Sequence, residues 1–363
     1  MEQILVKPIL YIKGSPINDV RLRKFLNYFV NNNISVSFIG WDRTGENSNI
    51  AGVKTNYLHR KGCNSKKQII FNYVIWMIKL FVKLLFTKNL KEYNIIAINF
   101  DSCLPLFIVS KIRNITYYYE IYDEFAISYN FPSKLKLLLQ RLDSKMIKRA
   151  VKVIHVDSNR CKSNCNNSII IENTPYDFLL RKERDYSKLE KTFAVIGYFS
   201  SSRGLDQIYK FAMENQDLKF LLVGVFANND ENEKKFNNLN NVLKYNYMPQ
   251  EQLFELMLSC CAIFSLYNPI LEINKFAASN KVYDSMMLGI PVITNKEVAN
   301  SKIISEKRIG IIVDYQYNET WDILKEKNIL QKCKELGSNG RQLYLEEYVF
   351  DELVNKRLVS ELV

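Results

Sequence analysis

Apolar runs of strand length alternate with amphipathic helical segments along almost the whole of this 363-residue chain. Such alternation is typical of βαβ units, which build parallel sheets with right-handed crossovers and helices on both faces. One series of strands is expected near 9–13, 36–39, 95–98, 116–121, 151–156 and 169–171, and a second near 193–198, 219–223, 242–245, 262–266, 291–294 and 309–313. No period of 20–50 residues repeats, which argues against a solenoid.

Helices are expected between these strands, near 19–31, 67–86, 104–112, 133–149 and after Ser158, then near 205–213, 250–259, 281–288 and 323–336. A chain of this length exceeds one ordinary hydrophobic core, so two domains are expected. A polar connector, 176–191, divides the two series and indicates two Rossmann-like halves. Ligands of open α/β sheets bind at the carboxyl ends of the strands, so two facing sheets would form a cleft between the domains.

The charge and the cysteine content of the chain limit the classes of partner and the cellular compartment that we expect. A formal net charge of +12 suits an anionic membrane, a phosphorylated ligand or a nucleic acid. Lys and Arg are scattered, however, and no nucleic-acid-binding motif accompanies them, so we expect no nucleic-acid partner. Seven cysteines without a CxxC pair, and only two histidines, favour a reducing cytoplasm over a disulfide scaffold or a zinc site. The first residues lack the layout of a signal peptide, which also favours the cytoplasm.

The stretch 278–294 holds the most specific pattern: a loop, one helix, a Gly-Pro turn and a buried strand. Ser279, Asn280 and Lys281 fall at or near the start of the helix, where free N–H groups and the positive end of the helix dipole suit a phosphate. Asp284 follows one turn later and could accept hydrogen bonds from ribose hydroxyls. The alternative is a capped helix packed on a parallel sheet, with Lys281 and Asp284 only solvated.

This stretch resembles the sugar-nucleotide segment of GT-B glycosyltransferases, most closely family 4 of the retaining enzymes. The family pattern is Pro-Asn-Lys-x-Tyr-Glu, an apolar turn of helix and Gly-x-Pro-Val-Ile; here Ser279 replaces Pro and Asp284 replaces Glu. The resemblance implies an α/β GT-B fold, in which two Rossmann-like domains with parallel sheets face an interdomain cleft. It also implies an acceptor-binding domain at 1–175, a nucleotide-sugar domain at 192–340 and a helix at 341–363 that crosses back to the first domain.

The same resemblance assigns donor contacts in the second domain. Arg203, which precedes Gly204, matches a basic residue that neutralises the donor diphosphate. Tyr247 and Met248 occupy the place where backbone groups of relatives contact the base. A common family arginine is replaced here by Tyr198, so one cationic contact is missing. The alternative for Arg203 is an ordinary surface position in a loop between a strand and a helix.

The sugar of the donor has less clear candidates. Many relatives carry a carboxylate eight residues before the second Glu of their motif, but that position is Phe276 here. Glu272 and Asn274 are the nearest polar residues and are candidates for contacts with the sugar. A solvated loop is an equal alternative for both, so the identity of the donor sugar stays open.

The first domain supplies candidates for binding the acceptor. Gly14 follows the first strand and permits a close approach of the backbone. Tyr122 and Asp123 match the family pattern Tyr-Asp-x-His-Glu or Tyr-Asp-x-His-Asp, with Tyr122 in place of His. The resemblance implies that Asp123 orients the acceptor or acts as a base, and the Tyr122 phenol can donate to a sugar hydroxyl. Asp123 and Tyr122 thus join Arg203 and Lys281 as candidate catalytic residues.

The segment 68–88 is strongly apolar but contains Lys79 and Lys83. Two lysines in a run of this length disfavour a membrane-spanning helix. A helix at 66–88 lying on an anionic membrane surface fits better, as a peripheral association. The alternative is a core helix packed under the first sheet.

Taken as a whole, the resemblance implies a cytoplasmic hexosyltransferase, possible also on the inner face of the plasma membrane. Its donor would be a nucleotide-diphosphate sugar, UDP-linked by analogy, and transfer would proceed with retention. Its acceptor would be a saccharide or lipid-linked saccharide in surface polysaccharide synthesis. We expect no resident cofactor and no metal. The alternatives are an inverting transferase, a sugar-nucleotide epimerase or a catalytically degenerate partner subunit; a nucleotide oxidoreductase is disfavoured because no GxGxxG follows a strand.

Overall fold

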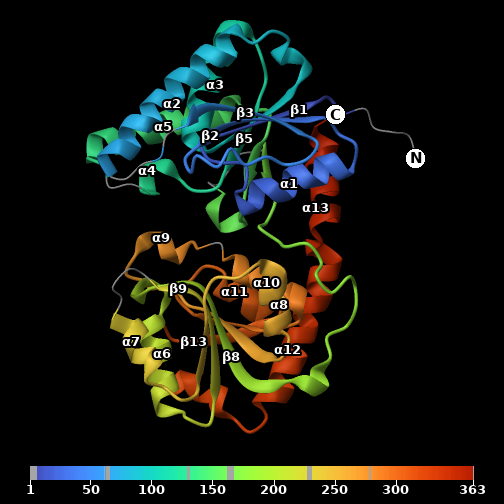
Figure 1. Ribbon diagram of the computed structural model, residues 1–363. Coiled ribbons are helices and arrows are strands. Elements are labelled where there is room, and N and C mark those ends of the chain that lie inside the picture. Colours follow the sequence, from blue (N-terminus) through green and yellow to red (C-terminus); the bar gives the residue numbers. More distant parts are fainter. Residues whose placement is uncertain are drawn as a thin grey trace. The chain divides into compact units, whose positions relative to one another are not determined.

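The computed structural model (Figure 1) describes residues 6–60, 62, 66–128, 131–161, 167–226, 231–277 and 279–362. The chain divides into two compact units. The first contains Met1–Glu172 and Val354–Val363, and the second contains Asn173–Leu353. The expected connector at 176–191 therefore belongs to the second unit, and the last residues of the chain belong to the first.

The first unit is built on a seven-stranded parallel sheet with strand order β3-β2-β1-β4-β5-β6-β7. Its strands are β1 (Ile9–Lys13), β2 (Val36–Asp42), β3 (Val53–Arg60), β4 (Asn94–Ile98), β5 (Tyr118–Ile121), β6 (Val153–His155) and β7 (Ser168–Ile170). The central strands are buried along their whole length. β3 has no counterpart among the predicted strands, because most of its side chains are exposed or half-buried and it lacks an apolar run.

Helices flank this sheet at α1 (Val20–Asn31), α2 (Lys66–Phe86), α3 (Asn99–Arg113), α4 (Phe125–Ser128) and α5 (Ser133–Arg149). Short 3₁₀ turns follow at Leu90–Glu92 and Ser158–Arg160. The helix predicted at 104–112 begins at Asn99 instead. Pro105, a residue that prefers the first turn of a helix, lies inside α3.

The second unit has a six-stranded parallel sheet with strand order β10-β9-β8-β11-β12-β13. Its strands are β8 (Glu190–Phe199), β9 (Lys219–Phe226), β10 (Val242–Tyr245), β11 (Cys260–Ser265), β12 (Val292–Asn295) and β13 (Gly310–Val313). All six were expected within a few residues of these bounds. The predicted fold class, two Rossmann-like domains with parallel sheets, is thus confirmed.

The helices of the second unit are α6 (Leu205–Glu214), α7 (Glu231–Asn237), α8 (Gln250–Met257), α9 (Glu272–Lys275), α10 (Asn280–Leu288), α11 (Ser301–Glu306) and α12 (Ile329–Leu343). A π-helix (Tyr344–Tyr348) and α13 (Phe350–Arg357) follow. α7, α9 and α11 are too short to show a helical period and were not predicted. The helix expected at 323–336 is divided between a 3₁₀ segment (Glu319–Lys325) and α12.

Two glycines let α12 pack closely against the end of α10. A Cβ atom on Gly337 would lie only 2.1 Å from the carbonyl oxygen of Gly289, the residue that ends α10 with a φ of 65°. Arg341, one helical turn beyond Gly337, donates to the carbonyl of Met287. The end of α10 is therefore fixed by backbone contact with α12, and this contact in turn fixes the direction in which α10 runs.

Replacing Gly337 with alanine should destabilise the protein by about 2–3 kcal/mol, because the new methyl group meets backbone that cannot move aside. The measurement is unfolding in guanidinium chloride. Gly340→Ala is the matched control on the same helix, since its Cβ would meet nothing closer than 3.5 Å. That variant should be neutral or more stable by up to about 1 kcal/mol, as alanine is the better helix former. Equal stability of the two variants would contradict this account.

Candidate functional site

The loop between β8 and α6 is a tight turn that presents Arg203. Ser201–Arg203 form a 3₁₀ turn, and Gly204 follows with a φ of 74°. A Cβ atom on Gly204 would lie 2.6 Å from Cβ of Leu266, so only glycine fits there. The turn is held from two sides, because the Tyr315 hydroxyl donates to the Ser201 carbonyl at 2.9 Å and the Asn268 N–H donates to the Ser202 carbonyl at 3.0 Å. This places Arg203 at the carboxyl edge of the sheet.

The loop between β11 and α10 brings Lys281 to the same edge. Ser265, the last residue of β11, lies 2.8 Å from Ser279, measured between their hydroxyl oxygens. Ser279 precedes α10 but makes no capping bond with its side chain, so its hydroxyl serves the strand and not the first turn of the helix. Lys281 extends from that first turn. Tyr267 follows β11, and its N–H donates to Oδ1 of Asn295 at 2.9 Å.

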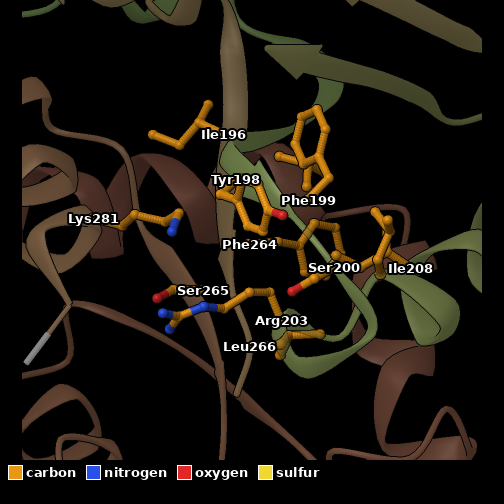
Figure 2. Close-up of a pocket in the computed structure, with 12 residues that line it drawn as sticks. Ile196, Tyr198, Phe199, Ser200, Arg203, Ile208, Phe264, Ser265, Leu266 and Lys281 are labelled. Carbon is orange, nitrogen blue, oxygen red and sulfur yellow. The ribbon is translucent and has the colours of Figure 1, made fainter. Parts of the chain in front are cut away.

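Arg203 and Lys281 line one pocket (Figure 2), where their charged ends lie on the same side. The guanidinium carbon of Arg203 lies 4.5 Å from the ring centroid of Tyr267. Burial alone would raise the pKa of the Tyr267 hydroxyl, but the charges of Lys281 and Arg203, with hydrogen bonds to Ser279 and Ser265, lower the pKa overall. The two cations thus place positive charge next to the Tyr267 phenol. The pocket itself holds only about 20 Å³, so an anion such as a diphosphate would bind at its mouth, against the Arg203 and Lys281 cations.

A second pocket of about 300 Å³ adjoins the first, and Tyr198 lines both. Its wall is made by the carboxyl ends of β8 and β9 and by the residues that follow β10: Gly197, Tyr198, Val223, Gly224, Val225, Tyr247, Met248 and Leu253. The two strands approach closely, because a Cβ atom on Gly224 would lie 1.8 Å from the Gly197 carbonyl oxygen. Volume and apolar lining suit a planar ring system.

Tyr247 and Met248, predicted near the base, thus line the larger pocket. The side chain of Tyr247 is 79% exposed, so its ring is accessible to a ligand. Neither residue could be assigned a side-chain role from sequence, because the pattern pointed only to backbone contacts.

The remaining predicted donor residues do not themselves line either pocket. Asn274 is buried, and its amide donates to the carbonyls of Asn268 at 3.0 Å and Ser202 at 3.4 Å, so it supports the turn that carries Arg203. Glu272 is exposed at the start of α9. Oδ1 of Asn280 accepts a bond from Asn173 at 2.7 Å. Asp284 is half-buried on α10.

In the first unit, the group that approaches the backbone of Gly14 closely belongs to the protein itself. A Cβ atom on Gly14 would lie 2.1 Å from Oδ2 of Asp101. The Gly14 N–H donates to the Ser102 hydroxyl at 3.0 Å, and Arg43 donates to the Gly14 carbonyl. Gly14 is therefore a packing requirement of the carboxyl edges of β1 and β4.

Tyr122 lies in a group of charged side chains at the same edge. Its ring centroid is 4.3 Å from Nζ of Lys13 and 5.5 Å from Cζ of Arg21. Burial, and then the charge of Glu120, raise the pKa of Tyr122 well above its usual value, so the phenol stays protonated. Asp123, the next residue, is exposed. The structure thus places the two predicted acceptor residues in different environments.

Asp101 was not predicted, because its partners come from distant parts of the chain. It lies in the first turn of α3, is only 6% exposed and has a pKa raised to about 6 by burial, which the charges of Arg43 and Lys13 partly oppose. A carboxyl group with such a pKa can exchange a proton near neutrality.

Asp101→Asn should remove a pH-dependent loss of stability. Because the pKa of Asp101 is raised in the folded state, that state binds the proton more tightly, and deprotonation destabilises the fold as the pH rises from about 4 to 6. Relative to the wild type, the variant should therefore gain up to about 3 kcal/mol between pH 4 and pH 8. Urea unfolding at several pH values measures this difference. If the free energy of unfolding depends on pH in the same way in the two proteins, Asp101 has the same pKa in the folded and the unfolded state.

Two Rossmann-like units with parallel sheets define the GT-B fold. No family model and no curated protein matches the chain. Among solved structures, sucrose-phosphate synthase from Thermosynechococcus elongatus is similar, with a TM-score of 0.71 and 13% identity over 96% of this chain and 97% of that one. HepE from Anabaena, in complex with UDP-glucose, gives a TM-score of 0.66 and 16% identity over 98% and 100%. WaaG, a glycosyltransferase involved in lipopolysaccharide biosynthesis, gives 0.64 and 11% over 96% and 98%. These likenesses establish the fold.

Proposed function

We propose that the protein is a glycosyltransferase that uses a nucleotide-diphosphate sugar, UDP-linked, as its donor. The observation that carries this proposal is the convergence of Arg203 and Lys281 on Tyr267, beside a pocket of about 300 Å³. The two cations suit a diphosphate, and the larger pocket suits a nucleobase. The complex of HepE with UDP-glucose shows that this fold accommodates such a donor in a similar protein.

The chemistry of transfer follows from where negative charge develops. When the bond between the anomeric carbon and the diphosphate breaks, the departing oxygen becomes more negative. Lys281 and Arg203, fixed in a partly enclosed pocket, stabilise this charge more than water would. The N–H groups in the first turn of α10 contribute in the same direction. Tyr267 positions the Arg203 guanidinium under its ring.

The finer features of the proposal rest on the family pattern. We propose a hexosyl donor, transfer with retention, and a saccharide or lipid-linked saccharide acceptor in the synthesis of a surface polysaccharide. A cytoplasmic location follows from the cysteine usage. The acceptor would bind at the first unit, where the exposed Asp123 can orient a hydroxyl group, whereas the Tyr122 hydroxyl is buried and would have to become accessible before it could donate to a sugar.

The test uses the full-length protein and a panel of nucleotide sugars. Saturating binding of UDP or a UDP-sugar should raise the melting temperature, and incubation should release UDP. The anomeric configuration of the product, read by NMR, separates retention from inversion and from epimerisation. Binding without any UDP release, even with saccharide acceptors, would favour the degenerate partner subunit. Failure to bind any nucleoside diphosphate would overturn the proposal.

A further inference from the structure

The helix α2 exposes an apolar face that no other described element covers. Its exposed large apolar side chains recur at spacings of one to four residues: Ile70, Phe71, Val74, Ile78, Val82 and Phe86. Phe71 is 65% exposed and Phe86 is 77% exposed. Only 22% of an 18-residue stretch within Gln68–Phe86 is buried, although the helix is long and apolar enough to cross a membrane. A patch of this kind on a folded protein marks an interaction surface.

Neighbouring helices continue this face. α2 packs on α3, and α3 packs on α5, so the three form one layer over the first sheet (Figure 1). α3 and α5 add exposed apolar side chains of their own: Ile108, Ile112, Leu135, Leu137 and Leu138. The ring centroid of Tyr73 lies 6.1 Å from that of Phe125, which lies 5.6 Å from Phe131, two residues before α5. Phe125 of α4 therefore connects α2 to the residues that precede α5 at one corner of the layer.

The layer is strongly basic as well as apolar. The sequence of α2 holds four lysines and no acidic residue, and that of α5 holds six Lys and Arg and one aspartate. That aspartate, Asp143, accepts a hydrogen bond from Tyr119 at 2.7 Å. Apolar side chains flanked by lysines and arginines complement a bilayer with anionic headgroups, since the chains enter the acyl boundary while the cations meet phosphates.

We propose that the outer face of α2, α3 and α5 docks on an anionic lipid bilayer without crossing it. The opposite side of α2 is buried: Trp76, Leu80 and Leu84 are fully enclosed in the core of the first unit. Withdrawing α2 to span a bilayer would expose these side chains and carry Lys79 and Lys83 into the hydrocarbon. The helix therefore stays in place and its outer face alone enters the interface.

Sedimentation with vesicles tests the proposal on the full-length protein. The wild type should bind vesicles of phosphatidylcholine and phosphatidylglycerol, bind neutral phosphatidylcholine vesicles at least tenfold more weakly, and lose affinity as salt rises. Phe71→Ser with Phe86→Ser should weaken binding at least tenfold at an unchanged melting temperature. Lys134→Glu with Lys145→Glu should have a similar effect on anionic vesicles only. Met213→Ser with Leu243→Ser, which change exposed apolar residues of the second unit, are the matched control and should bind as the wild type does.

Four results would overturn the proposal. Absent or charge-independent binding of the wild type would exclude an anionic surface. Unchanged binding of the Phe71→Ser, Phe86→Ser variant would exclude this face, and a dimer that these changes dissociate would assign it to a second copy of the chain. Protein that resists extraction from the vesicles at high pH would indicate a spanning helix. None of these outcomes depends on the sugar-transfer activity.

Discussion

Lys281→Ala and Arg203→Ala are each expected to lower the rate of sugar transfer by about 10²–10³-fold, with the fold intact. Each change removes one positive group from the pocket in which the diphosphate would leave. Both residues act on the same ligand, so their effects should not add, and the double variant should lose less than the product of the two single losses. The measurement is kcat and KM for UDP release, with the acceptor saturating.

The control for this experiment is a lysine with the same charge and no role in the pocket. Lys210 is exposed on α6, and Lys210→Ala should leave kcat and KM unchanged. Arg203→Lys separates charge from shape: a lysine restores the charge but cannot hold the same place under the Tyr267 ring, so it should recover only part of the rate. Full activity of Lys281→Ala would place the leaving group elsewhere.

Val225→Trp is expected to weaken the binding of UDP at least tenfold. Val225 is half-exposed on β9 and lines the larger pocket, so an indole there occupies space that a base would need while the core stays intact. Leu243→Trp is the matched control, because Leu243 is an equally exposed strand residue outside that pocket. Calorimetric titration with UDP measures the difference between the two variants.

Val225→Trp also distinguishes the larger pocket from the pocket lined by Arg203 and Lys281. Inorganic pyrophosphate needs only the cations, so Val225→Trp should bind it as the wild type does, whereas Lys281→Ala should bind both UDP and pyrophosphate more weakly. If Val225→Trp binds UDP normally and folds normally, the base does not use this pocket.

The elements that could be predicted from sequence are those whose signal is local. Twelve of the strands have apolar runs, and the stretch from Ser279 to Thr294 carries its own loop, helix and strand signals. β3 was missed since an edge strand with exposed side chains has no such run. The positions of Arg203 and Lys281 at loop ends followed from the glycines and helices beside them.

The parts that could not be predicted depend on contacts between distant residues. Nothing in the sequence singles out Tyr267, and its pKa is lowered only because Arg203 and Lys281 reach it from two other segments. Asp101 is buried against Gly14 and near Arg43, which lie at the ends of other strands. Asn274 was a candidate for a contact with the sugar, with a solvated loop as an equal alternative, and no local pattern indicates that its amide donates to two backbone carbonyls. No spacing in a single sequence reveals such contacts.

The bare backbone of Gly197 and Gly224 limits how this protein can evolve. A side chain at Gly224 would collide with the Gly197 carbonyl oxygen, so this position in the wall of the larger pocket cannot accept another residue. Under the proposed function, selectivity for a different base would have to arise at lining residues that carry side chains, such as Val225, Tyr247 and Met248. Natural homologues with altered donor preference should therefore differ at these positions while both glycines persist.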